Sequence, residues 1–163
     1  NNGYAIVGNI PYNLSGFIIR RLTKIQTPPH SAIFLMQKEV ADRILMQDNL
    51  MSLLSLSVAL WGNAELLLRV PPSCFIPQPK VHSSLIMLRP LPNQLPVEKR
   101  ESLLAKAKPF FQAKRKQIGH TLKTAYSKTP DQTQVLLQGL NIPHTMRPEN
   151  LSVADWIALC DIL

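Results

Sequence analysis

The chain has 163 residues, a formal net charge of +8 and a pI of about 9.8, with 45% hydrophobic and 17% charged residues. This composition excludes a disordered chain and leaves room for one domain with a substantial core or for two small domains. Two cysteines exclude a disulfide framework, and neither a secretory signal nor an apolar stretch of the roughly 18 residues of a membrane span is visible. We therefore expect a cytoplasmic protein without a membrane partner.

Strands and helices alternate in the first part of the chain. Apolar runs predict a strand over 4–8 and a second strand, covered on both faces, over 32–36, with a helix capped by Ser15 over 13–23 between them. The same reasoning predicts helices over 38–46 and 50–61 and strands over 64–70 and 83–88. The last strand follows a proline-rich loop over 71–80, and we expect it to be an edge strand or an antiparallel strand of the same sheet.

A helical part follows a second proline-rich segment. Three prolines between 89 and 96 stiffen a linker, which we place at 91–97. Beyond it, apolar spacing predicts helices over 98–111, 114–124, 133–140 and 153–163, the last capped by Ser152 and Asp155. The order of elements predicts an α/β domain over 1–90 and a small all-α domain over 98–163. With four strands, the first domain is about half of a doubly wound sheet.

Positive charge is concentrated in the helical part. Between Lys99 and Lys128 there are nine Lys and Arg residues and one acid, Glu101. This concentration favours a polyanion such as nucleic acid as the partner. The triplet Lys114, Arg115 and Lys116 is the candidate for phosphate contacts, and a solvated helix face is the alternative interpretation. The four histidines lack the spacing of zinc ligands, so no metal site is expected.

The tetrapeptide 9–12, Asn-Ile-Pro-Tyr, directly follows the first strand. Open α/β sheets bind ligands at the carboxyl ends of their strands, so it is the first candidate site. The Asn9 side-chain oxygen and the Pro11 carbonyl offer acceptors for the hydrogens of an aromatic amine, which would aim the nitrogen lone pair at an electrophile. The Tyr12 ring offers a surface on which a base stacks. A plain strand-to-helix turn is the alternative interpretation.

A second aromatic side chain, Phe75, stands in the stiff loop 71–80. A base taken out of its stack needs both faces covered, and Tyr12 and Phe75 could supply the two surfaces. The alternative is a phenylalanine that is merely buried in its loop. Lys80, at the end of this loop, is either a phosphate contact or an anchor of the loop.

Five segments, in the right order along the chain, resemble the ribosomal RNA adenine N6-dimethyltransferase family of the KsgA type. They are 8–15, with the tetrapeptide, 37–40, 71–81, 111–116 and 146–152. The resemblance implies that 1–90 is the C-terminal half of a Rossmann-like S-adenosylmethionine methyltransferase domain, joined to a helical RNA-binding domain. It implies that Asn9 and the Pro11 carbonyl position the adenine N6, that Tyr12 and Phe75 stack on the ring, and that Asn9 borders S-adenosylmethionine.

The implied activity is the methylation of two adjacent adenosines near the 3′ end of small-subunit rRNA, carried out by a monomer on the immature small ribosomal subunit. Two departures from the family pattern stand out. The Gly-rich cofactor loop is absent, so we expect this chain by itself to bind the methyl donor weakly or not at all and to be inactive. Gly119 and His120 stand where the family commonly has Arg-Asn, at the cost of one RNA contact.

Two other functions remain open on the sequence. The large-subunit rRNA methyltransferases that confer macrolide resistance often have Ile at the position of Ile10, whereas the segment 147–152 favours the small-subunit enzymes. The third possibility is a non-catalytic RNA-binding or ribosome-assembly factor, or a relative of the mitochondrial transcription factors. The intact Asn9, Pro11, Tyr12 and Phe75 favour an enzyme.

Overall fold

A mixed sheet forms one side of the molecule. The computed structural model describes residues 3–113 and 115–163. In spatial order the sheet contains β1 (Ala5–Asn9), β2 (Ser31–Gln37), β4 (Ser83–Pro90) and β3 (Gly62–Val70). β1 and β2 are parallel, whereas β4 is antiparallel to both of its neighbours. The prediction of an antiparallel strand over 83–88 is therefore confirmed, but the strand lies inside the sheet and not at its edge.

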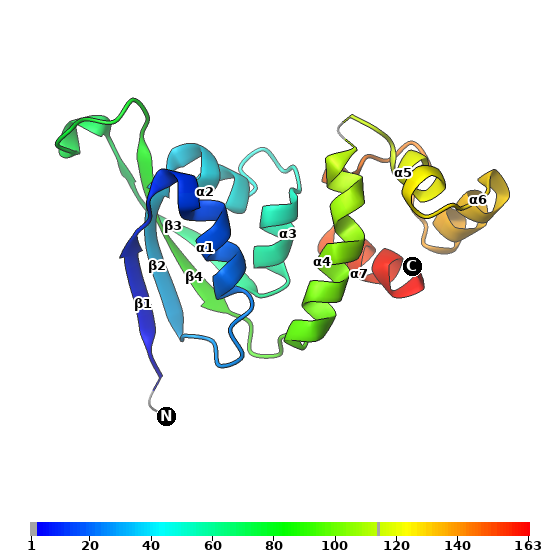
Figure 1. Ribbon diagram of the computed structural model, residues 1–163, viewed down its shortest axis with the longest axis horizontal. Coiled ribbons are helices and arrows are strands. Elements are labelled where there is room, and N and C mark those ends of the chain that lie inside the picture. Colours follow the sequence, from blue (N-terminus) through cyan, green and yellow to red (C-terminus); the bar gives the residue numbers. More distant parts are fainter. Residues whose placement is uncertain (1–2, 114) are drawn as a thin grey trace.

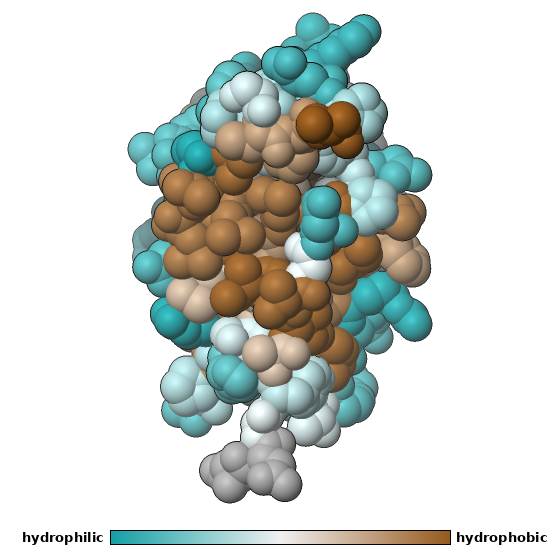
Figure 2. Space-filling view, turned by 90° about the vertical axis from the view of Figure 1, so that its left-hand side faces the viewer, coloured by the Kyte–Doolittle hydropathy of each residue, from teal (hydrophilic) through white to brown (hydrophobic). Residues whose placement is uncertain are grey.

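Three helices, α1 (Ser15–Leu22), α2 (Lys38–Ile44) and α3 (Leu53–Ala59), cover one face of the sheet (Figure 1). Alternate residues of β2 and β4, such as Phe34 and Ile86, are buried toward these helices. Their neighbours Ile33 and Leu35 are only half-buried, because within the described residues no helix covers the opposite face. The prediction that this strand is covered on both faces is thus wrong for the described chain. Apolar side chains gather on the uncovered face (Figure 2).

The second half of the chain is helical. It contains α4 (Val97–Gln112), α5 (Ile118–Ala125), α6 (Pro130–Gly139) and α7 (Val153–Ile162). These helices form a second hydrophobic core together with the region of α3: Phe110, Leu122 and Trp156 are buried in it with Leu56 and Leu60. α4 therefore packs on α3 as well as on α7 (Figure 1). None of the helices in the described ranges is long and apolar enough to cross a membrane.

The helices predicted from 50, 114 and 133 begin at Leu53, Ile118 and Pro130, and of the two predicted caps only the one at Ser152 is confirmed. Ser15 does not cap its helix: a 3₁₀ turn over Tyr12–Leu14 runs directly into α1, so Ser15 lies inside the helix. The predicted helix over 114–124 begins only at Ile118, because Arg115 has a positive φ of 64° that an α-helix does not tolerate. At α7, the Ser152 hydroxyl accepts a hydrogen bond from the Asp155 N–H, 3.1 Å, as predicted.

Gly62, the first residue of β3, lies against the backbone of its antiparallel neighbour β4 without room for a side chain. A Cβ at this position would overlap the Arg89 carbonyl group, which is backbone and cannot move aside. A Cβ on Gly139, in α6, would meet no atom within 4 Å. The same glycine-to-alanine change at Gly139 is therefore the control for the change at Gly62.

We expect Gly62→Ala to lower the free energy of unfolding by about 2 kcal/mol or more, because the strands must separate to admit the methyl group. Gly139→Ala should leave it unchanged or raise it by up to about 1 kcal/mol, because alanine is the better helix former. Urea unfolding of the two variants beside the unaltered chain measures both values. Equal stability of the two variants would contradict the close contact between Gly62 and the backbone of β4.

Candidate functional site

The carboxyl ends of three strands and one loop meet at the same edge of the sheet. β3 is antiparallel to β4, and β4 is antiparallel to β2, so β3 runs in the direction of β1 and β2. The connection over 71–82, which follows β3, therefore starts at this same end of the sheet, and its residues Phe75, Pro77 and Pro79 reach the end of β1. There a small cavity of about 340 Å³ is lined by Asn9, Ile10, Pro11, Tyr12, Phe75, Pro77 and Pro79. The four residues singled out from the sequence thus lie around one cavity.

The end of β1 is held by backbone hydrogen bonds. The Ile10 N–H donates to the Leu35 carbonyl oxygen, 2.9 Å, which carries the pairing with β2 one residue beyond Asn9. The Pro11 carbonyl accepts a bond from the Leu14 N–H, 2.9 Å. A carbonyl oxygen has two lone pairs, so the Pro11 carbonyl keeps one for a ligand. Asn9 is exposed, and its side chain forms no hydrogen bond within the described residues.

Tyr12 is held by a hydrogen bond to the start of β4. Its hydroxyl lies 3.0 Å from the Ser83 hydroxyl, in hydrogen-bonding distance, and Ser83 is fully buried at the start of β4. The bond fixes the direction of the ring, because the ring is anchored at both ends. Sequence analysis did not identify Ser83. Its only signal there is its position directly after the proline-rich loop.

Phe75 comes from the 71–82 connection. Its N–H donates to the Pro72 carbonyl, 3.1 Å, at the end of a short 3₁₀ turn, and its side chain is half-buried. Its neighbour Ile76 is fully exposed. Phe75 is therefore not a core residue of the loop: it lines the cavity together with Pro77 and Pro79.

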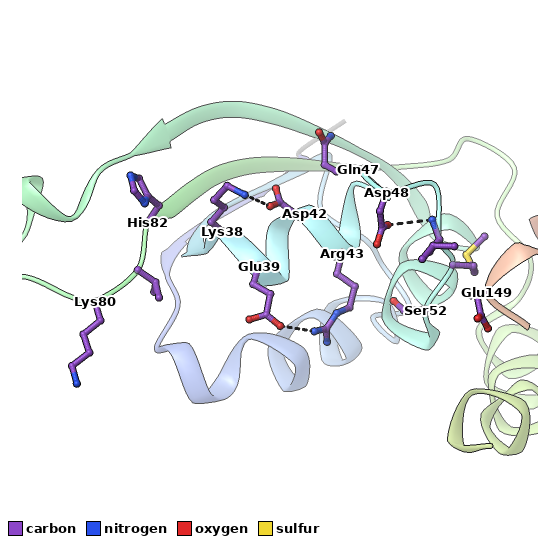
Figure 3. Close-up of a pocket in the computed structure, with 13 residues that line it drawn as sticks. Lys38, Glu39, Asp42, Arg43, Gln47, Asp48, Ser52, Lys80, His82 and Glu149 are labelled. Atoms are coloured by element: carbon purple, nitrogen blue, oxygen red, sulfur yellow. Dashed lines mark hydrogen bonds and ion pairs between the residues drawn. The ribbon is translucent and has the colours of Figure 1, made fainter. Parts of the chain in front are cut away.

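Lys80 lies in a different, larger hollow. This hollow of about 930 Å³ runs from Lys80 and His82 along α2 to Glu149 (Figure 3). The structure does not place Lys80 in the lining of the small cavity with Asn9. Its side chain extends away from α2 (Figure 3) and forms no ion pair within the described residues. The Lys80 ammonium group is therefore free to meet a phosphate.

The charged residues of α2, in contrast, are paired with one another. Lys38 bonds to Asp42 at 2.6 Å, and Arg43 bonds to Glu39 at 3.0 Å. Asp42 also accepts a bond from Arg69 of β3 at 2.5 Å. Burial raises the pKa of Asp42, but the bonds from Lys38 and Arg69 outweigh it, and the pKa is lowered overall. The carboxylate thus joins α2 to the sheet below the larger hollow.

Of the predicted basic triplet, Lys114 lies outside the described residues. Arg115 and Lys116 are exposed in the connection between α4 and α5, not on a helix. A further hollow of about 560 Å³ brings Arg115 together with Arg20 of α1 and Arg43 of α2. Sequence analysis did not connect these two arginines with the site. This hollow is lined by three arginines and one acid, Glu149, whereas the larger hollow has three basic and four acidic side chains.

The comparison with known sequences assigns the chain to a family. The sequence pattern of the family described as "Ribosomal RNA adenine dimethylase" matches residues 1–163, so the chain belongs to that family. It is 36% identical over 163 residues to the ribosomal RNA small subunit methyltransferase A of Acaryochloris marina, covering 96% of this chain and 60% of that protein. Against the protein of the same name from a Nostoc species the identity is 34% over 165 residues, covering 97% of this chain and 60% of that protein. The chain thus spans about 60% of the length of these relatives.

Solved structures share the fold. The chain superposes on the 23S rRNA methyltransferase ErmE with a TM-score of 0.73 and 21% identity, over 98% of this chain and 64% of that one. A dimethyladenosine transferase from Plasmodium falciparum gives a TM-score of 0.77 and 23% identity, over 96% of this chain and 65% of that one. The predicted fold class, part of a Rossmann-like methyltransferase sheet followed by helices, is confirmed.

The lowered pKa of Asp42 predicts a pH dependence of stability. A carboxyl whose pKa is lower in the folded than in the unfolded chain stabilises the fold above its unfolded pKa of about 4, and this contribution is lost as the pH falls through the folded pKa. We expect Asp42→Asn to unfold at lower urea concentration than the unaltered chain at pH 7. The difference should shrink as the pH falls below about 4. A difference that stays constant down to pH 2 would contradict the ion pairs.

Proposed function

We propose that the protein to which this chain belongs is an S-adenosylmethionine-dependent rRNA adenine N6-dimethyltransferase. Its substrate is two adjacent adenosines near the 3′ end of small-subunit rRNA in the immature small ribosomal subunit, and it acts as a monomer in the cytoplasm. One observation carries the proposal: Asn9, Pro11, Tyr12 and Phe75 line one cavity at the carboxyl end of β1. Family membership and the names of the curated relatives support the choice of substrate.

Each of the four residues has a role that its surroundings permit. The unengaged Asn9 amide oxygen and the second lone pair of the Pro11 carbonyl accept the two hydrogens of the adenine amine. These bonds favour a pyramidal nitrogen, whose lone pair is then directed and no longer delocalised into the ring. Tyr12, fixed by Ser83, and Phe75, fixed by its loop, cover the two faces of the flipped base.

The methyl donor fits beside Asn9. The exposed Asn9 amide lies at the carboxyl end of β1, where open α/β sheets bind their ligands. When bound, S-adenosylmethionine supplies a methyl group that an amine attacks directly. Asn9 is the residue of this chain that borders it. Among the described residues that line the cavity, none is a carboxylate, histidine or lysine that could serve as a general base, and the amine proton becomes acidic once the nitrogen carries the new methyl group.

The two parts of the chain have different roles, base binding and RNA binding. Residues 1–90 supply the cavity, the linker 91–97 joins them to the helices, and residues 98–163 bind RNA. Lys80, Arg115 and Lys116 contact phosphates, with Lys114 as a further member of the group. Two observations support this assignment, because RNA affinity depends on such cations: Lys80 forms no ion pair within the described residues, and Arg115 lies with Arg20 and Arg43 around one hollow.

A large-subunit rRNA methyltransferase is the second candidate, because ErmE shares the fold. The small-subunit enzyme is favoured because its curated representatives are 34–36% identical, against 21% for ErmE. Assaying the whole protein on small-subunit and large-subunit rRNA separates the two. Methyl groups on large-subunit rRNA alone would exclude the proposed substrate.

Substitutions in the whole protein test the roles in the cavity. We expect Asn9→Ala to lower kcat about 10²–10³-fold, because it removes an acceptor that holds the reacting amine. Phe75→Ala should lower kcat/KM about 10-fold or more through the lost stacking surface. Transfer of a labelled methyl group to small-subunit rRNA measures both effects.

Ile76→Ala is the matched control for Phe75→Ala. It removes an apolar side chain from the adjacent position of the same loop, but Ile76 is fully exposed and does not line the cavity. Its activity should equal that of the unaltered protein. An Asn9→Ala variant with full activity, or equal losses in the two loop variants, would refute the roles assigned here.

A further inference from the structure

A cavity outside the site described above lies between α5 and α6. It has a volume of about 620 Å³, within the range of small-molecule sites. α5 and α6 pack on each other at the end of the molecule that is far from the sheet (Figure 1). The cavity is therefore remote from the one beside Asn9, and whatever it binds is not the target adenosine.

Gly119 keeps this cavity open. It is a buried residue of α5, and a Cβ there would point between Thr133 of α6 and the His144 carbonyl, at 3.5 and 3.9 Å. An alanine methyl group would just fit, whereas a longer side chain would occupy the cavity. Gly119 is also one of the positions at which the sequence departs from the family pattern. With a glycine at this position, the space beside Thr133 and the His144 carbonyl stays open.

The walls offer hydrogen bonds in both directions. α6 presents Thr133, Gln134, Leu137 and Gln138 at helical spacing, with Thr133 and Leu137 buried at the bottom and the two glutamines exposed at the rim. The Thr133 side-chain oxygen is buried and has no hydrogen-bond partner in the described part of the chain. The Thr133 Cγ2 methyl lies 3.5 Å from the Cβ position of Gly119, so the hydrogen-bonding groups that α6 offers to a ligand are the amides of the two exposed glutamines.

α5 and the loop after α6 complete the walls with Gln117, His120, Lys123 and His144. Within the described ranges, none of these four side chains forms a hydrogen bond or an ion pair, and no lining residue is an acid. Amides that both donate and accept match the edges of a nucleobase, and imidazole rings stack on its face. Lys123 supplies a charge for the phosphate of the same nucleotide.

From these observations we propose that the cavity between α5 and α6 binds one unpaired nucleotide of RNA, which it recognises by its base. The inference rests on the proposed function in that the protein is taken to bind RNA. It adds a second base-binding site to the protein. The exposed Arg115 and Lys116, a few residues before α5, lie on the chain that leads into the cavity and favour RNA over an uncharged ligand.

Filling the cavity tests the proposal in the whole protein. Gly119→Leu places a side chain in the cavity, and Gly139→Leu places the same side chain on α6 in open space. Fluorescence anisotropy with a labelled fragment of small-subunit rRNA from its 3′ end measures affinity. We expect Gly119→Leu to bind about 10-fold or more weakly and Gly139→Leu to bind as the unaltered protein does.

Salt dependence separates a base contact from a phosphate contact. Gly119→Leu and Gln138→Ala should each weaken RNA binding by a factor that does not change with salt concentration. Lys123→Gln should instead reduce the slope of log affinity against log salt concentration by about one, because it removes one charge. Gln138→Ala, which removes an exposed side chain, serves as the second variant if Gly119→Leu does not fold. Unchanged RNA affinity in folded Gly119→Leu, or in Gln138→Ala where only that variant folds, overturns the proposal.

The failure of this proposal can be told from the failure of the proposed function. A protein that methylates small-subunit rRNA, but whose Gly119→Leu variant binds it normally, lacks only the second site. A protein that binds RNA through this cavity but transfers no methyl group has the second site without the proposed activity.

Discussion

The reversed direction of β4 is the constraint on which the site depends. Because β4 is antiparallel to β2 and to β3, the strand before it and the two parallel strands end at the same edge of the sheet. The connection from β3 to β4 must turn back at that edge, and it carries Phe75 to the end of β1. A parallel crossover in its place would put the connection elsewhere, and Phe75 would not line the cavity with Tyr12.

Contacts at the start of β4 hold this arrangement together. The buried Ser83 bonds to the Tyr12 hydroxyl, and its neighbour Ser84 accepts a bond from Arg69, which also holds Asp42 of α2. The His82 carbonyl accepts a bond from the Lys38 N–H, at the first residue of α2. The proline-rich loop is thus fixed where it returns to the sheet, and its earlier residues are left to line the cavity.

Features set by local sequence could be predicted, whereas features set by packing could not. The four strands and the Ser152 cap follow from apolar runs and from a short hydrogen-bonding motif, and both are confirmed. The start of α5 was missed because Arg115 adopts a positive φ that its residue type does not favour. Ser83, Arg20 and Arg43 were missed because they join the sites only through the tertiary fold. The tetrapeptide at 9–12 was recognisable because its parts are adjacent in the chain.

The central claim is that Tyr12 and Phe75 enclose a target adenine whose amine is held by Asn9 and the Pro11 carbonyl. A structure of the whole protein bound to a small-subunit rRNA fragment and an unreactive analogue of the methyl donor tests it most directly. The account predicts one adenine stacked between the two rings, with its N6 within about 3 Å of the Asn9 and Pro11 oxygens. An adenine bound outside this cavity, or one that stays in its RNA stack, would contradict the account.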